Sequence, residues 1–240
     1  MRIAREGLPQ IVLSTVVLGG AIWAAAIWFW PAAIPPALIW IWSVAFFRDP
    51  RRETVFDDRT MCAPADGTVQ DITMLDGDPT IGGPAVRVGI FLSLFNVHIN
   101  RSPCAGTVRS VQFKPGRFLA AMNPAAGELN ESNTLVIDPE TPLPGPVIVR
   151  QIVGVAARRI VCHAEPGTRL TTGERFGLIK FGSRTELIVP RMEGTQVLVG
   201  VGDRVQAGLT ALVRQSAVPA ESVGHGQHRQ NERRIAAATP

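Results

Sequence analysis

The segment L178-I-K-F-G-S-R-T-E-L-I-V-P190 places a Gly-Ser pair between two apolar runs that each resemble a buried strand. A serine hydroxyl is a weak nucleophile until a base removes its proton, and a glycine lets the main chain approach closely and adopt strained angles. Gly182 and Ser183 are therefore a candidate nucleophile beside an accessible carbonyl. A bulge or tight turn between two strands is the alternative interpretation of the same pair.

A nucleophilic serine needs a base, and the four histidines of the chain offer few choices. His98 ends an apolar run in F91-L-S-L-F-N-V-H98, where the alternative is a histidine packed in the core. His163 sits in a turn-like segment, and two further histidines lie near the C-terminus. Asp66, in the rigid turn P64-A-D-G67, is the best placed carboxylate to orient His98, although Asp-Gly also simply makes good turns. Asp66, His98 and Ser183 form a charge-oriented nucleophile system if the fold brings them together.

The elements that must position these residues are mainly β-strands. Beyond residue 52, short β-branched runs alternate with Gly, Pro and Asp, which predicts strands of about 4 to 8 residues. These runs are V86-R-V-G-I-F-L, T134-L-V-I, V147-I-V-R-Q-I-V-G-V, E186-L-I-V and Q196-V-L-V-G-V. One helix is predicted near Arg117 to Met122.

Two internal echoes predict a duplicated architecture. P64-A-D-G-T-V-Q-D-I72 matches P103-C-A-G-T-V-R-S-V111, and G167-T-R-L-T-T-G173 matches G202-D-R-V-Q-A-G208. Each glycine can supply the positive φ of a tight turn that leads into a strand. The expected product is a compact β-sandwich or barrel-like domain.

The N-terminal region predicts a transmembrane helical hairpin over residues 1–47. Residues 11–30 are uncharged and mostly apolar, about the ~20 residues that a helix needs to cross a bilayer. Prolines at 31, 35 and 36 suit the turn before a second apolar stretch, and all five tryptophans lie in this region. Arginines flank both sides, which places both flanks in the cytoplasm and requires two crossings or one re-entrant loop. A cleaved signal peptide is the alternative, but the apolar region is longer than usual for one and no small-residue cleavage site follows it. We expect a catalytic domain over 48–214 and a disordered tail over 215–240.

Composition excludes several classes of site and partner. The three cysteines lack C-x-x-C spacing, which indicates a reducing compartment, no disulfide framework and no metal site. The net charge of +4 favours anionic lipid headgroups, and no basic run with interleaved aromatics predicts nucleic-acid binding.

Five segments together resemble the short, membrane-associated form of phosphatidylserine decarboxylase over residues 45 to 213. They are R48-D-P-R-R, P64-A-D-G, N96-V-H-I-N-R-S-P, F113-K-P-G-R-F-L with N130-E-S-N, and F176-G-L-I-K-F-G-S-R-T-E186. The resemblance implies self-cleavage between Gly182 and Ser183 into residues 1–182 and 183–240, which stay together as a heterodimer. It also implies a covalent pyruvoyl cofactor made from Ser183, with His98 as base and Asp66 as its partner.

The implied reaction converts phosphatidylserine to phosphatidylethanolamine and CO₂ at the cytoplasmic side of a bacterial inner membrane. Arg101 and Arg117 are expected to hold the lipid phosphate. The longer bacterial form carries two histidines around this strand, whereas this chain has His98 alone, so His98 serves cleavage, decarboxylation or both. Ser132 stands where the family often has arginine.

Two other classes of function remain open on the residues. The first is a membrane-tethered serine hydrolase using Asp66, His98 and Ser183, although F181-G-S-R-T185 lacks the second glycine of a nucleophile elbow. The second is a non-catalytic β module of the carrier type, which the G-x-R-(L/V)-x-x-G echo suggests.

Overall fold

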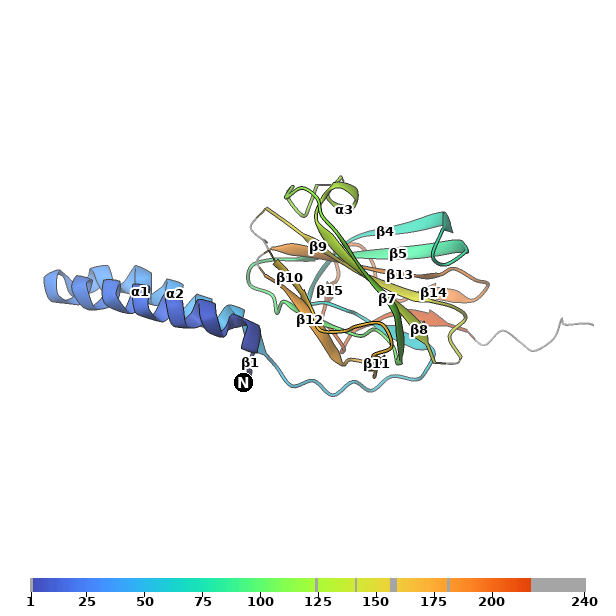
Figure 1. The fold of residues 1–240 in the computed structure, drawn as a ribbon, viewed down its shortest axis with the longest axis horizontal. Coiled ribbons are helices and arrows are strands. Elements are labelled where there is room, and N and C mark those ends of the chain that lie inside the picture. The colour runs from blue at the N-terminus through green and yellow to red at the C-terminus, as the bar shows by residue number, and fades with distance from the viewer. Residues whose placement is uncertain (1, 124, 141, 156–158, 181, 217–240) are drawn as a thin grey trace, which may run out of the picture.

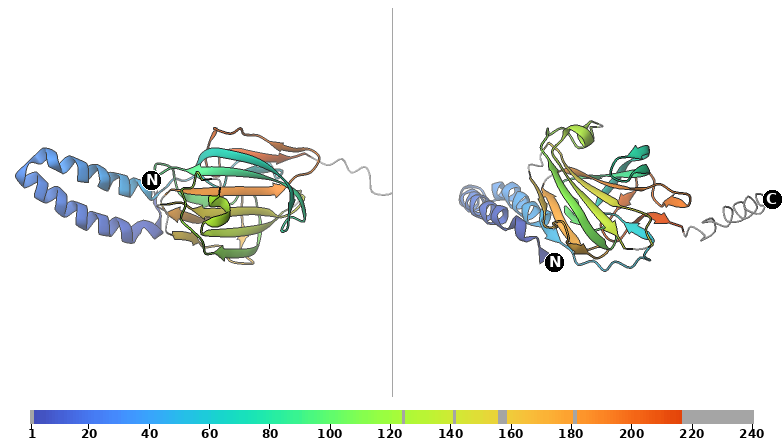
Figure 2. Two further views of the ribbon diagram at one scale, coloured as in Figure 1. Left: turned by 90° about the horizontal axis from the view of Figure 1, so that it is seen from above. Right: turned by 45° about the vertical axis from the view of Figure 1, so that its right-hand side comes forward.

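A computed structural model describes residues 2–123, 125–140, 142–155, 159–180 and 182–216 (Figure 1). It shows a β domain from which two helices project side by side (Figure 2). Most of the predicted tail lies outside the described residues. The mainly β fold with an apolar N-terminal helix is the predicted fold class.

The projecting helices form the predicted hairpin, with α1 at Leu8–Trp28, a short 3₁₀ turn η2 at Trp30–Ala33 and α2 at Ile34–Phe46. Trp40 Nε1 donates to Thr15 Oγ1 over 2.9 Å and so ties α2 to α1. Most of the large apolar side chains of both helices are exposed. The span Arg5–Trp28 is the one described helix long and apolar enough to cross a membrane, since Trp30–Phe46 is shorter.

An eight-stranded antiparallel sheet forms the centre of the β domain. Its strands, in spatial order, are β11 (Arg169–Leu170), β7 (Gly106–Lys114), β8 (Ser132–Pro139), β9 (Val147–Val153), β13 (Ser183–Pro190), β5 (Gly83–Leu92), β4 (Gly67–Asp78) and β15 (Arg204–Val205). One face of the sheet carries the largest cluster of buried apolar side chains.

Smaller elements close the domain around this core. One three-stranded sheet contains β10 (Arg159–Cys162), β12 (Arg175–Lys180) and β6 (Ile99–Arg101), and the other contains β14 (Thr195–Val197), β16 (Ala211–Gln215) and β3 (Thr60–Cys62). A two-stranded pair, β1 (Arg2–Ile3) with β2 (Arg48–Asp49), joins the chain segments on either side of the hairpin.

The internal echoes of the sequence correspond to equivalent structures at the two ends of the large sheet. In β4, Thr68 pairs with Arg204 of β15, and in β7, Thr107 pairs with Arg169 of β11. The glycines that flank β11 and β15 all have positive φ, from 73° to 97°: Gly167, Gly173, Gly202 and Gly208. The predicted duplication is therefore present in strand pairing as well as in sequence.

The prediction of a helix near Arg117 to Met122 is wrong. Residue 117 instead forms an isolated bridge with Asn130, and the short helix α3 lies later, at Ala126–Leu129. The Asn130 side chain explains the difference, because its amide bonds both the N–H and the C=O of Leu119 at 2.9 Å. These contacts replace the helical hydrogen bonds of that residue.

Two glycines of β4 give a matched test of this packing. A Cβ at Gly67 would lie 2.1 Å from the carbonyl oxygen of Phe91, whereas a Cβ at Gly77 would meet nothing within 4 Å. We expect Gly67→Ala to lower the free energy of unfolding by about 1–3 kcal/mol, because main chain of β5 must move. Gly77→Ala should change it by less than about 0.5 kcal/mol. Thermal unfolding of both variants measures the difference, and equal midpoints would contradict the close approach of β4 and β5.

Candidate active site

Ser183 is the first residue of β13 and is held from both sides of the strand. It pairs with Leu92 of β5 and with Val153 of β9. The residue is 0% exposed, and its Oγ has no hydrogen-bond partner among the residues that the structure describes. A buried hydroxyl without a partner is costly in a folded protein, which marks this serine as a site with a use beyond packing.

Gly182, on the other side of the candidate bond, leaves the sheet abruptly. Its φ of +50° lies in the left-handed region that glycine tolerates and other residues rarely adopt. Its carbonyl oxygen lies against the main chain of Gly154, where a Cβ would be only 2.4 Å away. Two glycines therefore shape the space around the carbonyl that Ser183 would attack.

His98 is brought to the same end of β13 by strand β6. Ile99 pairs with Leu178 of β12, so His98 lies beside the last residues before the Gly182–Ser183 bond. The next residue of β6, Asn100, donates from Nδ2 to Thr185 Oγ1 over 3.2 Å, which places β6 over the start of β13. His98 Nε2 is a second buried polar atom that has no hydrogen-bond partner within the described part of the chain. The structure thus places His98 beside the strand end that precedes the Gly182–Ser183 bond, and in the described chain His98 Nε2 and Ser183 Oγ do not hydrogen-bond each other.

The surroundings of His98 keep its imidazole neutral at neutral pH. Burial lowers its pKa to about 4, because the charged ring loses its hydration; nearby Arg48 acts in the same direction. A hydrogen bond to the Asn96 carbonyl and the charge of Asp66 act in the opposite direction. Nδ1 lies 3.0 Å from Asn96 O, and since a carbonyl only accepts, Nδ1 carries the proton. Nε2 is therefore left with a free lone pair at neutral pH.

Asp66 does not make the expected hydrogen bond to His98. Its two oxygens bind both guanidinium nitrogens of Arg52, at 2.5 and 2.8 Å, and the N–H of Ala207 at 2.9 Å. Asn96 O takes the orienting position instead. Asp66 acts on the imidazole only through its charge in this uncleaved chain, so the expectation of a contact triad is corrected.

The two arginines expected to bind phosphate lie in different surroundings. Arg101 is buried and donates to the carbonyls of Gly173 and Pro50 and to Asp49, at 3.0 to 3.2 Å. These contacts use it for the fold, so a phosphate role does not fit its placement. Arg117 is exposed on the segment before α3, and its role in phosphate binding stays a prediction.

A buried polar network next to the site was not anticipated from the sequence. Gln151 Nε2 donates to Asn100 Oδ1 over 2.9 Å, and Asn133 Nδ2 donates to Gln151 Oε1 over 3.0 Å. With the Asn100 bond to Thr185, these amides fix β6 over β8, β9 and β13. The sequence offered one signal for this network: the polar residues Asn133 and Gln151, which lie at the ends of the apolar runs N133-T-L-V-I and V147-I-V-R-Q151.

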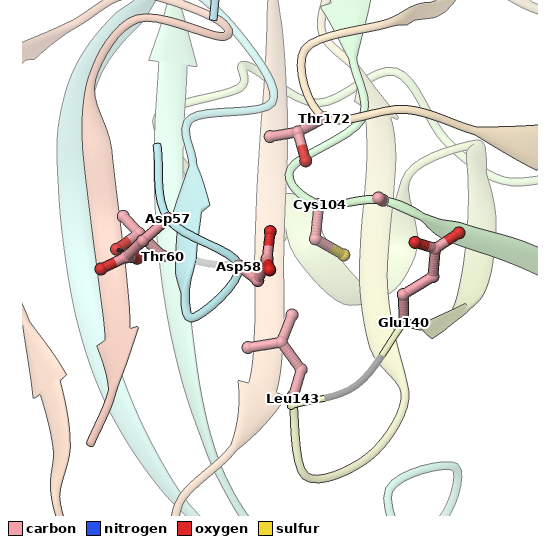
Figure 3. Close-up of a pocket in the computed structure, with 8 residues that line it drawn as sticks. Asp57, Asp58, Thr60, Cys104, Glu140, Leu143 and Thr172 are labelled. Carbon is pink, nitrogen blue, oxygen red and sulfur yellow. Dashed lines mark hydrogen bonds between the residues drawn. The ribbon is translucent and has the colours of Figure 1, made fainter. Parts of the chain in front are cut away.

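A different cavity, of about 80 Å³, contains several groups that could be taken for a reactive site (Figure 3). Asp57, Asp58, Glu140 and Cys104 line it, and neither Ser183 nor His98 does. Burial raises the pKa of Cys104 to about 12, so its thiol stays protonated and is a poor nucleophile. Three carboxylates would also repel an anionic ligand. No cluster of three or more His, Cys, Asp or Glu side chains in the described ranges is arranged to hold a metal ion.

Comparisons with known proteins agree on one family. A family model described as phosphatidylserine decarboxylase matches residues 40–213. A phosphatidylserine decarboxylase proenzyme of Rhodopirellula baltica is 45% identical over 213 residues, covering 88% of this chain and 87% of the relative. Proenzymes with the same name from Beijerinckia indica subsp. indica and Carboxydothermus hydrogenoformans are 41% and 40% identical, over 92% and 88% of this chain and 93% and 95% of the relatives.

Gly154 provides a test of the site geometry. We expect Gly154→Ala to slow cleavage of the Gly182–Ser183 bond by about 10- to 100-fold, because its Cβ displaces the carbonyl under attack. The matched control is Gly83→Ala, where a Cβ meets nothing within 4 Å. A time course of chain cleavage on denaturing gels measures both rates. Equal rates for the two variants would show that the Gly182 carbonyl is not confined by Gly154.

Proposed function

The chain belongs to the phosphatidylserine decarboxylase family, and from this premise we propose that it is a precursor that cleaves itself at Gly182–Ser183. The mature protein then removes CO₂ from phosphatidylserine to give phosphatidylethanolamine. The observation that carries the proposal is the pair of buried, unpartnered polar atoms, Ser183 Oγ and His98 Nε2, at a bond whose carbonyl residue is a left-handed glycine.

The first chemical step uses only groups of this chain. His98 Nε2 takes the proton of Ser183 Oγ, and the oxygen attacks the Gly182 carbonyl carbon. The C–N bond then breaks and the proton passes to the Ser183 nitrogen, so that an ester and a free amine replace the peptide bond. Loss of the Ser183 α-proton then expels the Gly182 carboxylate and leaves dehydroalanine at position 183. Addition of water and loss of ammonia turn this residue into a pyruvoyl group at the start of the fragment 183–240.

The sheet supports this step by holding both partners of the reaction. β13 is paired along Ser183–Pro190, and β12, which ends at Lys180, is paired with both β6 and β10. Such positioning makes the attack effectively unimolecular, which can supply up to about 11 kcal/mol of the barrier. After cleavage, the same pairing keeps residue 183 in the sheet and holds the two fragments together as a heterodimer.

The covalent pyruvoyl group would supply the electron sink for decarboxylation, and Ser183 is a fitting source for it because its hydroxyl has no structural contact to lose. The protein contributes the enclosed surroundings and His98. Because burial lowers its pKa to about 4, His98 is neutral in the uncleaved chain at neutral pH and carries no proton on Nε2 to donate. This supports a role in self-cleavage ahead of a role in protonating the product.

The lipid substrate would reach the site from the membrane side. The loop that follows β5 carries exposed Leu94 and Phe95, and Arg48 at the base of the hairpin donates from Nη2 to the Phe95 carbonyl over 2.6 Å. Helix α2, at 13 residues, spans only about 20 Å, less than the ~30 Å hydrocarbon core. We therefore place the hairpin in the membrane as a partly re-entrant unit, with the catalytic domain on the cytoplasmic side of a bacterial inner membrane.

Replacement of Ser183 tests the proposal. We expect the purified wild-type protein to run as two fragments and to release CO₂ from phosphatidylserine vesicles, whereas Ser183→Ala stays one chain and releases none. The matched control, Ser110→Ala in β7, should cleave and turn over normally. Normal fragments from Ser183→Ala would move the cleavage site elsewhere. A single wild-type chain that reacts with a serine-directed phosphonate would instead indicate a hydrolase.

Replacement of His98 tests the assignment of the base. Because the folded-state pKa of His98 is lowered to about 4, its neutral form persists on acidification, so the wild-type cleavage rate should stay level from pH 8 to about 5 and fall below that. His98→Ala should reduce the rate by about 10²- to 10⁴-fold at all these pH values. His225→Ala is the control. Unchanged cleavage in His98→Ala would require another base.

A further inference from the structure

The last residue of the membrane hairpin lies directly on the candidate base. The ring of Phe46, at the end of α2, has its centroid 4.3 Å from the centroid of the His98 ring, with 33° between the ring planes. Both side chains are 2% exposed. The imidazole is therefore covered by an element that belongs to the hairpin rather than to the β domain, 52 residues earlier in the chain.

The base of the hairpin is fixed to the β domain by contacts that are independent of Phe46. Lys180 Nζ, at the end of β12, donates to Glu6 O over 2.9 Å and so joins the hairpin base to the β domain. Ala4 N donates to Phe47 O over 2.8 Å and joins the two arms of the hairpin to each other. A Cβ at Gly7 would lie 2.2 Å from the Phe47 ring, so the two arms of the hairpin meet in close contact there. Since Lys180 ends the strand that leads to Gly182, the hairpin base is fixed to the cleavage segment as well.

Salt bridges strengthen the same junction. Glu6 is bound by Arg175 of β12 and by His163, and Arg175 Nη1 also binds Asp49 at 3.1 Å. Arg101 Nη2 reaches Asp49 from β6 at 3.2 Å. The charged groups at the junction are thus largely paired with one another, and the Phe46 ring supplies an apolar contact to the imidazole.

We propose that Phe46 is a positioning residue: it covers the His98 ring and fixes the orientation of that ring during self-cleavage, and so makes the membrane hairpin a structural part of the active site. Asn96 O fixes the ring through Nδ1 and Phe46 covers its face, which together leave one orientation for Nε2. The contact also excludes water from the imidazole and so keeps it neutral. The inference rests on the proposed self-cleavage, for which His98 is the base.

Two charged groups act on the pKa of His98: Arg48, which follows α2, and Asp66, in the turn before β4. Lys180, at the end of β12, lies over the neighbouring Phe47 ring, with its Nζ 5.9 Å from the ring centroid. None of these is removed by a change at Phe46. A shift in the pH dependence of a Phe46 variant therefore reports the lost cover over the imidazole rather than an altered charge.

The test uses full-length chains made by cell-free translation into vesicles of phosphatidylglycerol and phosphatidylethanolamine, with cleavage followed from pH 4 to 8.5. We expect Phe46→Ala to raise the midpoint of the acid limb from about 4 toward the ordinary histidine value of ~6.5. Its rate at pH 6 should then be about fourfold below its own rate at pH 8. Phe46→Leu keeps most of the buried volume, so it should retain the fold and show a smaller shift in the same direction.

Phe29→Leu and Phe29→Ala, at the hairpin turn, are the matched controls and should keep the wild-type profile. The inference is overturned if the acid-limb midpoint of Phe46→Leu equals that of wild type, whether or not its rate falls uniformly, because a uniform loss reports packing alone. Ser183→Ala measured in parallel separates the two proposals. If Ser183→Ala is still cleaved, the proposed function is wrong. If Ser183→Ala is not cleaved and Phe46→Leu keeps the wild-type pH profile, only the role of Phe46 is wrong.

Discussion

Everything in this structure depends on where the regular pairing of β13 begins. Ser183 is paired on both sides, with Leu92 and Val153, whereas Gly182, one residue earlier, has a left-handed main chain. The bond between them is thus the boundary between a rigid sheet and a sharp change of direction. The hydroxyl of Ser183 is thus carried by a residue that two strands fix, next to the carbonyl of a left-handed glycine, and an intramolecular attack profits from such fixed positioning. The same pairing would retain residue 183 after its bond to Gly182 is cut.

Two other features of the molecule, a buried network of amide side chains and the base of the hairpin, lie near that boundary. The amides of Asn100, Gln151 and Asn133 fix β6 over the sheet, which brings His98 to the start of β13. The hairpin base adds Phe46 over the imidazole and Lys180 bound to Glu6 beside the cleavage segment. A site for a lipid must open toward the bilayer, and here the apolar helices leave the domain from the side where the reacting groups are buried. In the proposed function, the membrane hairpin and the site of self-cleavage therefore meet at one junction.

The sequence was sufficient for features whose signal is local or repeated. Alternating β-branched runs predicted the strands, the paired glycine motifs predicted the equivalence of β4 with β7, and the uncharged N-terminal run predicted the helices. The sequence did not predict contacts between separate segments. Arg52 binds the carboxylate that was expected to orient His98, and Asp49 binds Arg101. Asn130 binds the main-chain groups that were expected to form a helix near residue 119. Asp66 and Arg101 were assigned to function although other side chains already bind them in the fold, and the helix was predicted without the main-chain contacts of Asn130.

The central claim is that Ser183 is consumed in cutting its own chain. Intact mass spectrometry of the purified wild-type protein tests this most directly, before and after borohydride reduction. The account predicts a fragment 183–240 that is lighter by one ammonia than the product of simple hydrolysis, and that gains two hydrogens on reduction of its ketone. A continuous chain of 240 residues with an intact serine at 183, still releasing CO₂ from phosphatidylserine, would contradict it.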